Sequence, residues 1–166
     1  MDELVRWLGE QLDEDERIAR AAIAAVGDVP GAADWRFGNA YTDEGGTYWQ
    51  ITTMTPSTDG FSLVELVGCG MSGGGAHEPE IARHAVEHDP ARVLREIDAK
   101  RHMVADYGEA LRMRDRLEPN TSGYRHWDNR ALGLLHALRH AAAVYTDRPG
   151  YAEALAAAKA ALLADE

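Results

Sequence analysis

The sequence of 166 residues contains little cysteine, little lysine and no long apolar run. Its single cysteine, Cys69, excludes an internal disulfide and a zinc cluster made of cysteines from one chain. No stretch approaches the roughly 18 consecutive apolar residues that a membrane-spanning helix requires. Residues 1–4 are acidic where a secretion signal would be basic. We therefore expect a cytoplasmic protein without a membrane span.

Acidic residues outnumber basic ones, and the excess is confined to the first half of the sequence. Residues 1–80 contain 15 acidic and four basic residues, whereas residues 81–166 contain 13 of each, within a net charge of −11. A negative field repels phosphates, so direct binding of nucleic acid is not expected. The same field attracts a basic partner protein, although a high net charge also serves solubility alone.

The composition, with 45% hydrophobic and 27% charged residues, is typical of one soluble globular domain. We expect a single domain over residues 1–166, with an acidic helix and a β-meander in residues 1–75 and a charge-neutral helical part in residues 76–166. The first helix is expected over residues 2–26. Its apolar stripe is formed by Leu4, Leu8, Leu12, Ala19, Ala22, Ile23 and Val26.

Three short runs rich in β-branched and aromatic residues follow, at 35–41, 47–55 and 61–69. They are separated by turn residues, which predicts a three-stranded antiparallel meander. The fold class is therefore expected to be α+β, with a mostly helical C-terminal half packed on the sheet. The helices expected in that half cover residues 79–87, 90–118 and 127–145, with a last helix from Tyr151.

Histidines recur at a spacing of four on two of the expected helices. His84 and His88, and likewise His136 and His140, share one helical face at this spacing, so each pair can chelate a divalent metal. The two pairs together would make a four-histidine site for zinc, iron, manganese or nickel. None of them belongs to the Glu-x-x-His motif of carboxylate metal sites, so surface or structural histidines are the alternative.

Two features of the acidic half predict a protein-binding surface. Four consecutive acids lie in the middle of the first helix, where the helix dipole gives no benefit and like charges repel. Aromatic residues gather on the expected meander, and exposed aromatic residues mark interfaces. A solvated helix face and an apolar core are the structural alternatives. The predicted interaction residues are Asp13, Glu14, Asp15, Glu16, Trp35 and Trp49.

The glycine-rich residues 68–73 fit the dinucleotide-binding pattern Gly-x-Gly-x-x-Gly. That fold requires a second parallel strand with an acid near its end, and no strand-like run follows Gly75. We therefore expect no nucleotide cofactor, and a divalent metal is the one candidate cofactor. No serine or cysteine lies in a nucleophile motif, so a non-catalytic role is favoured over an enzyme.

Three segments of the sequence are characteristic in their order and position. They are residues 1–5 running into 12–16, residues 88–94 (His-Asp-Pro-Ala-Arg-Val-Leu) through 99–101, and residues 145–151 (Tyr-Thr-Asp-Arg-Pro-Gly-Tyr). In these segments the chain resembles a family of uncharacterised small proteins of actinobacteria and their phages, known by a domain-of-unknown-function label. The resemblance implies a cytosolic accessory protein with no assigned activity.

Members of that family typically carry a Cys-x-x-Cys pair and a further cysteine before the Pro-Gly-Tyr segment, which resembles a zinc site. Residues 105–142 of this chain contain no cysteine, so the resemblance carries no zinc ligands over to that stretch. The spacing His84-x-x-x-His88, followed by Asp89 and Pro90, does match the family.

The expected function is that of a non-catalytic protein-binding or regulatory accessory factor. One alternative is a divalent-metal protein, such as a hydrolase, that uses the histidine pairs. The other is a self-associating helical module, in which residues 90–118 and the alanine-rich residues 156–161 pack across the two-fold axis of a homodimer.

Overall fold

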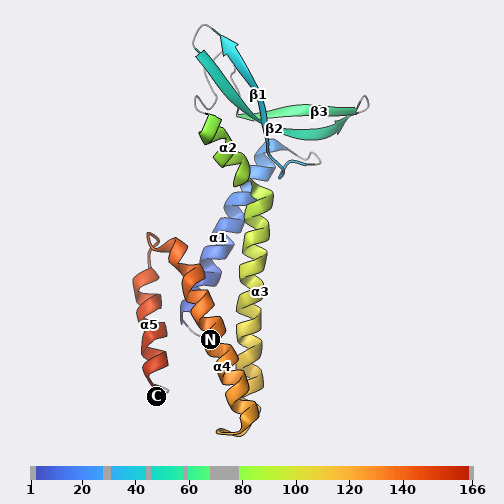
Figure 1. Cartoon of the computed structure of the whole chain (residues 1–166). Helices are drawn as coiled ribbons and strands as arrows, with labels where there is room; N and C mark the ends of the chain where they lie inside the picture. Colours follow the sequence, from blue (N-terminus) through green and yellow to red (C-terminus); the bar gives the residue numbers. More distant parts are fainter. Residues whose placement is uncertain (1–2, 28–30, 44–45, 58–59, 68–78, 165–166) are drawn as a thin grey trace. The chain divides into compact units, whose positions relative to one another are not determined.

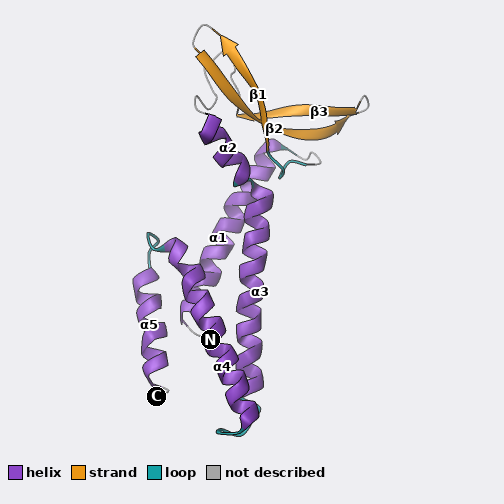
Figure 2. Ribbon diagram, viewed as in Figure 1, coloured by secondary structure: helices purple, strands orange, loops and turns teal. Residues whose placement is uncertain are grey.

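A computed structural model describes residues 3–27, 31–43, 46–57, 60–67 and 79–164 of the chain. Figure 1 follows its elements along the sequence, and Figure 2 colours them by type. In order, the elements are α1 (Glu3–Val26), β1 (Arg36–Asp43), β2 (Gly46–Ser57), β3 (Gly60–Val67), α2 (Pro79–Glu87), α3 (Pro90–Arg114), α4 (Ser122–Ala142), the 3-10 helix η1 (Ala143–Tyr145) and α5 (Tyr151–Ala164).

Helices dominate the described residues, so the predicted α+β class is wrong and the chain is α-rich with a small sheet. α1, α3 and α4 contain 24, 25 and 21 residues, whereas β1, β2 and β3 contain 8, 12 and 8. α4 begins earlier than its apolar pattern predicts because Thr121 caps it. The Thr121 backbone is extended, and its side-chain oxygen accepts a hydrogen bond of 3.1 Å from the N–H of Tyr124.

The sheet is two strands wide over most of its length, which also corrects the prediction of a three-stranded meander. β1 pairs antiparallel with the first half of β2, from Arg36 opposite Thr52 to Asp43 opposite Gly46. β3 pairs antiparallel with the second half of β2, so the strand order is β1-β2-β3. Only Ile51 and Thr52 have partners in both neighbouring strands. Each pairing has a register irregularity, and the two hairpins share β2 end to end (Figure 2).

The buried centre of the sheet coincides with this shared segment. Ile51, Thr52 and Thr53 are all buried, and the Thr53 hydroxyl donates a hydrogen bond to the carbonyl oxygen of Gly31. α2 lies against β1 and β2. There the guanidinium group of Arg83 lies 5.3 Å from the ring centre of Phe37, a cation–π contact. α2 is thus the helix that covers this part of the sheet.

Contacts divide the chain into two compact units. The first unit comprises residues 1–15 and 96–166, and the second comprises residues 16–95. The C-terminal helices were expected to pack on the sheet, but α4 and α5 belong to the first unit, together with the beginning of α1, and the sheet belongs to the second. The prediction of a single domain over residues 1–166 stays a prediction.

The net charge is nearly equal in the two units, although it differs strongly between the two halves of the sequence. The first unit contains 17 acidic and 11 basic residues, a net charge of −6, and the second contains 11 acidic and six basic residues, a net charge of −5. The strong imbalance between the two halves of the sequence disappears because the acidic residues 1–15 join the charge-neutral C-terminal part. Both units are therefore moderately acidic.

The core of the first unit is built on the leucine stripe of α1. Leu4, Leu8 and Leu12 are fully buried, as the period-four spacing predicts, and each contributes about 1.5–3 kcal/mol by leaving water. Two alanines of α5, Ala154 and Ala158, are buried in this core, and small side chains let a helix approach closely. The other buried apolar residues of the unit's helices are Val5, Trp7, Ile97, Tyr107, Ala110, Ala131, Leu135, Leu138, Ala142 and Tyr145.

Trp7 connects this core to the segment between η1 and α5. Its indole N–H donates a hydrogen bond of 2.9 Å to the carbonyl oxygen of Pro149. Its ring meets Tyr145 edge-on at 6.3 Å and Tyr151 at 5.7 Å between ring centres. Gly150 turns beneath the indole with a φ of +84°, and a Cβ atom there would lie 2.9 Å from the Trp7 ring nitrogen. Only glycine fits this turn without displacing the tryptophan.

We expect Gly150→Ala to destabilise the protein by about 2 kcal/mol, because alanine combines an unfavourable positive φ with a clash against Trp7. The matched control is Gly133→Ala in α4, where an added Cβ meets no atom within 4 Å. The control should stabilise the helix by about 0.5–1 kcal/mol. Urea denaturation gives the change in the free energy of unfolding for both variants. Equal changes would contradict the packing of Gly150 against Trp7.

Candidate interaction site

The four acids predicted to bind a partner lie in α1, and two of them form ion pairs near the surface. An oxygen of Asp13 lies 2.6 Å from a guanidinium nitrogen of Arg101 in α3, and 74% of the Asp13 side chain is exposed. Glu16 accepts a hydrogen bond of 2.7 Å from Arg20, one helical turn later. Exposed pairs of this kind contribute about 0–1 kcal/mol each.

Asp15 has a different environment, because its carboxylate is largely covered and accepts two hydrogen bonds from residues 145–151. The hydroxyl of Tyr145 donates to one oxygen at 2.6 Å, and the guanidinium group of Arg148 pairs with the other. Arg148 also donates to the backbone and side-chain oxygens of Gln11, at 3.4 and 3.3 Å, and lies 4.7 Å from the ring centre of Tyr145. Asp15 therefore serves the fold of the first unit.

Tyr145 is buried, and it is less exposed than Asp15 and Arg148. Burial, and next the adjacent Asp15 carboxylate, raise the pKa of Tyr145 well above its ordinary value of 10.0. The hydroxyl therefore stays protonated at neutral pH and remains a donor to Asp15. Trp7, Gln11 and Asp15 follow one another at a spacing of four and share one face of α1. This face contacts Tyr145, Arg148 and Pro149.

Trp35 and Asp89 are joined where α3 begins. One oxygen of Asp89 accepts a hydrogen bond of 2.7 Å from the N–H of Arg92, which caps α3, and the other accepts one of 3.3 Å from the N–H of Trp35. The half-buried indole of Trp35 donates to the carbonyl oxygen of Ala32 at 3.3 Å. The backbone of Trp49 pairs with Ala40 in β1 and β2, but its side chain lies outside the described residues, as do the glycines at 68–73.

The four predicted metal ligands belong to different units. His84 lies in the last turn of α2 and His88 directly follows the helix, whereas His136 and His140 lie on α4 in the first unit; all four are exposed. Within the described part of the chain, no group of three or more histidine, cysteine, aspartate or glutamate side chains is placed to hold a metal ion. The four-histidine site stays a prediction.

The second half of α1 is apolar on nearly every side, and most of it is not buried. In residues 18–26 only Ala19 is buried, and Ile18 is 50% exposed. The sequence pattern assigned Ala22, Ile23 and Val26 to the core, yet each of them is only half-buried. The apolar surface of this segment therefore exceeds what the second unit covers.

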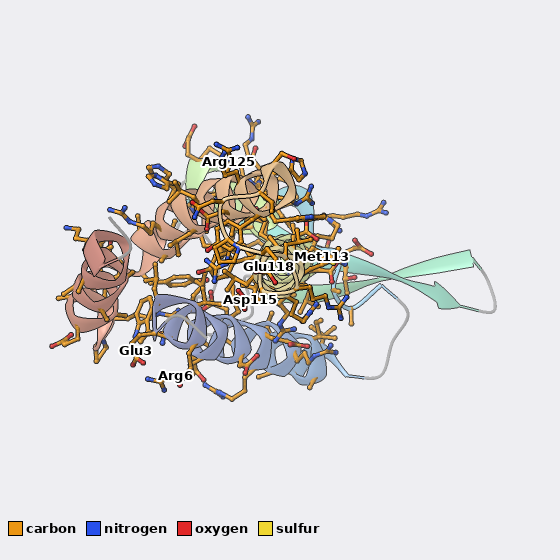
Figure 3. All side chains as sticks on the ribbon, turned by 90° about the horizontal axis from the view of Figure 1, so that it is seen from below. Glu3, Arg6, Met113, Asp115, Glu118 and Arg125 are labelled. Atoms are coloured by element: carbon orange, nitrogen blue, oxygen red, sulfur yellow. The ribbon has the colours of Figure 1, made fainter. Side chains whose placement is uncertain are left out.

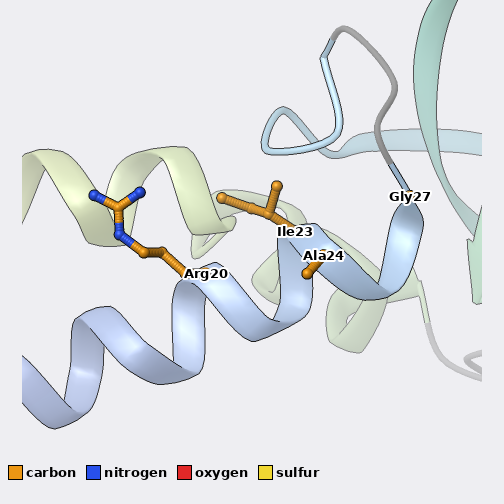
Figure 4. A pocket seen from close by; sticks show the side chains of 4 residues that line it. All are labelled: Arg20, Ile23, Ala24 and Gly27. Carbon is orange, nitrogen blue, oxygen red and sulfur yellow. The ribbon is translucent and has the colours of Figure 1, made fainter.

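A hollow of about 410 Å³ opens beside the last turns of this helix (Figure 4). It is lined by Arg20, Ile23, Ala24 and Gly27. Gly27 ends the helix with a φ of +98°, and its N–H donates a hydrogen bond of 3.1 Å to the carbonyl oxygen of Ala24. The guanidinium group of Arg20 is paired with Glu16 at 2.6 Å, so its charge is balanced at the edge of the hollow.

Sequence reasoning missed this site because it treated every apolar residue of α1 as part of one buried stripe. A usable signal is present. Before Asp15 the helix alternates apolar and charged residues, whereas alanine, isoleucine and valine occupy all sides of residues 18–26 apart from Arg20. A helix that buries one face requires an apolar stripe of only about 100°. The surplus apolar residues in this half predict a second contact.

Comparisons with known proteins identify one family and no characterised relative. The sequence model of a family of unknown function, DUF6221, matches residues 1–156. No curated protein and no solved structure matches the chain. Among the described helices, none combines the length and the apolar character needed to cross a membrane.

The role of Asp15 can be separated from that of its neighbour by substituting each acid with its amide. We expect Asp15→Asn to destabilise the protein by about 2 kcal/mol, because the half-buried Arg148 loses its counter-charge. Asp13→Asn should change the free energy of unfolding by less than about 0.5 kcal/mol, because its pair with Arg101 is exposed. Urea denaturation checks both values, and equal losses would contradict a structural role specific to Asp15.

Proposed function

We propose a protein-binding, non-catalytic role for this chain, which belongs to DUF6221, a family of unknown function. The proposed binding site is the second half of α1, residues 18–27. The observation that carries the proposal is that this apolar helical segment buries only Ala19 and borders an open hollow. Exposed apolar surface of this kind is a mark of protein interfaces.

The hollow suits one apolar side chain of a partner. Ile23 and Ala24 provide apolar contacts within it, and Ile18 extends the apolar surface along the helix. Burying a leucine-sized side chain there would contribute about 1.5–3 kcal/mol to binding before the cost of association. Such a contact gives a partner an anchor rather than a complete interface.

The proposed partner is a basic protein. The second unit, which contains the hollow, carries 11 acidic and six basic residues, and the whole chain has a net charge of −11. A basic partner would be attracted over distances of about 10 Å at moderate salt. The same charge disfavours nucleic acid. Trp35, which belongs to the same unit, is a further candidate residue for the interaction.

We also propose an origin in an actinobacterium or its phage and a cytoplasmic location. Only two of the 17 basic residues are lysine, which is typical of proteins encoded by GC-rich genomes. The segments at 88–94 and 145–151 support the same origin. A cytoplasmic location is supported by the single cysteine, since secreted proteins of this size commonly use disulfides.

Substitution of Ile18 tests the proposed site. Ile18→Asp places a charge in the apolar surface, so we expect a partner retained by the wild-type chain to bind at least about tenfold more weakly. The measurement is quantitative mass spectrometry of proteins retained from a lysate of the source cells, followed by affinity measurement with the purified partner. Raising the salt from about 0.1 M to about 0.5 M should also weaken binding.

Val144→Asp is the matched control, because Val144 is 65% exposed and belongs to the first unit. It introduces the same charge on another exposed apolar residue and should leave partner binding unchanged. If Ile18→Asp retains the partner with wild-type affinity, or if both variants lose it equally, the second half of α1 is not the binding site.

A further inference from the structure

Two imidazole rings lie together at the end of α2. The ring centres of His84 and His88 are 4.4 Å apart, with an angle of 59° between the ring planes. The N–H of His88 donates a hydrogen bond of 3.1 Å to the carbonyl oxygen of His84, so the helical spacing extends one residue beyond the helix. Both histidines are exposed. The two rings are therefore accessible from solvent and already adjacent.

The backbone that carries these rings is held on both sides. Asp89, the next residue, caps α3 and binds the N–H of Trp35. The guanidinium group of Arg92 donates a hydrogen bond of 2.8 Å to the carbonyl oxygen of Glu87. Arg83 is engaged with the ring of Phe37. These contacts fix the backbone of the turn between α2 and α3 and occupy the arginines closest in sequence.

We propose that His84 and His88 chelate a divalent cation of the zinc class. Neutral imidazole is a preferred ligand of Zn²⁺, and two histidines one helical turn apart can bind one ion from the same face. The site differs from the four-histidine arrangement because it uses one unit and two ligands. It is also independent of the proposed protein-binding site on α1.

Two protein ligands leave a tetrahedral zinc ion with two open positions. Within the described residues no third histidine, cysteine or carboxylate completes a cluster around the pair. The ion would then be held exchangeably, with water in the open positions.

The test is a titration of the full, untagged chain with Zn²⁺ alone at about pH 7.5. Calorimetry gives the affinity and stoichiometry, and the NMR signals of the histidine rings identify the ligands. We expect one ion per chain, with shifts confined to His84 and His88. His84→Gln and His88→Gln should each weaken binding by at least about tenfold.

The double variant His136→Gln/His140→Gln is the matched control, because these residues have the same spacing and are also exposed. It should bind Zn²⁺ like the wild-type chain. The proposal is overturned if the ring signals of His84 and His88 stay unchanged at about millimolar Zn²⁺, or if the control variant loses as much affinity as His84→Gln. Since no partner protein is present, a negative result leaves the outcome of the Ile18→Asp experiment unaffected.

Discussion

The first unit depends on one partly buried carboxylate, that of Asp15. It accepts hydrogen bonds from the hydroxyl of Tyr145 and the guanidinium group of Arg148, residues that follow it by more than 100 positions. A carboxylate withdrawn from water is costly unless it is paired, and a cation beside it is costly for the same reason. The network satisfies both charges at once, while Trp7, about two helical turns earlier on the same face of α1, binds the carbonyl of Pro149. Each of Tyr145, Arg148, Pro149 and Gly150 therefore has a specific contact with α1.

The same network shows that the four acids at 13–16 do not have one common role. In the sequence alone, Asp13–Glu16 suggests a uniform charged face that a basic partner could recognise. In the structure the four acids point to different places, because successive residues of a helix are 100° apart. Asp15 points into the unit, Asp13 meets Arg101, and Glu16 holds Arg20. Reversing all four charges together would put a lysine beside Arg148 and disturb the fold, so loss of binding in such a variant would not identify a surface.

Local patterns predicted the helices well, because each pattern is decided by neighbours in the sequence. The leucine spacing of α1 predicted a buried stripe, and the helix expected from residue 90 does begin at Pro90. The fold class was predicted wrongly because strand patterns do not reveal register: β1 and β3 use different halves of β2, so the sheet stays narrow. Nor does the sequence show that residues 1–15 join 96–166, which removes the apparent charge asymmetry. The hollow beside Ile23 was missed because the burial of a helix depends on which elements it meets in the fold. The spacing of His84 and His88 was visible in the sequence, but the contact between their rings was not.

The central claim is that α1 and residues 145–151 are held together through Asp15, and a double-mutant cycle measures this directly. The free energy of unfolding is compared for the wild-type chain, Asp15→Asn, Tyr145→Phe and the double variant. If the Tyr145 hydroxyl donates to Asp15 in a site shielded from water, the two substitutions couple by about 1 kcal/mol or more. Additive effects, within about 0.3 kcal/mol, would contradict the account, because they would show that the two side chains act independently.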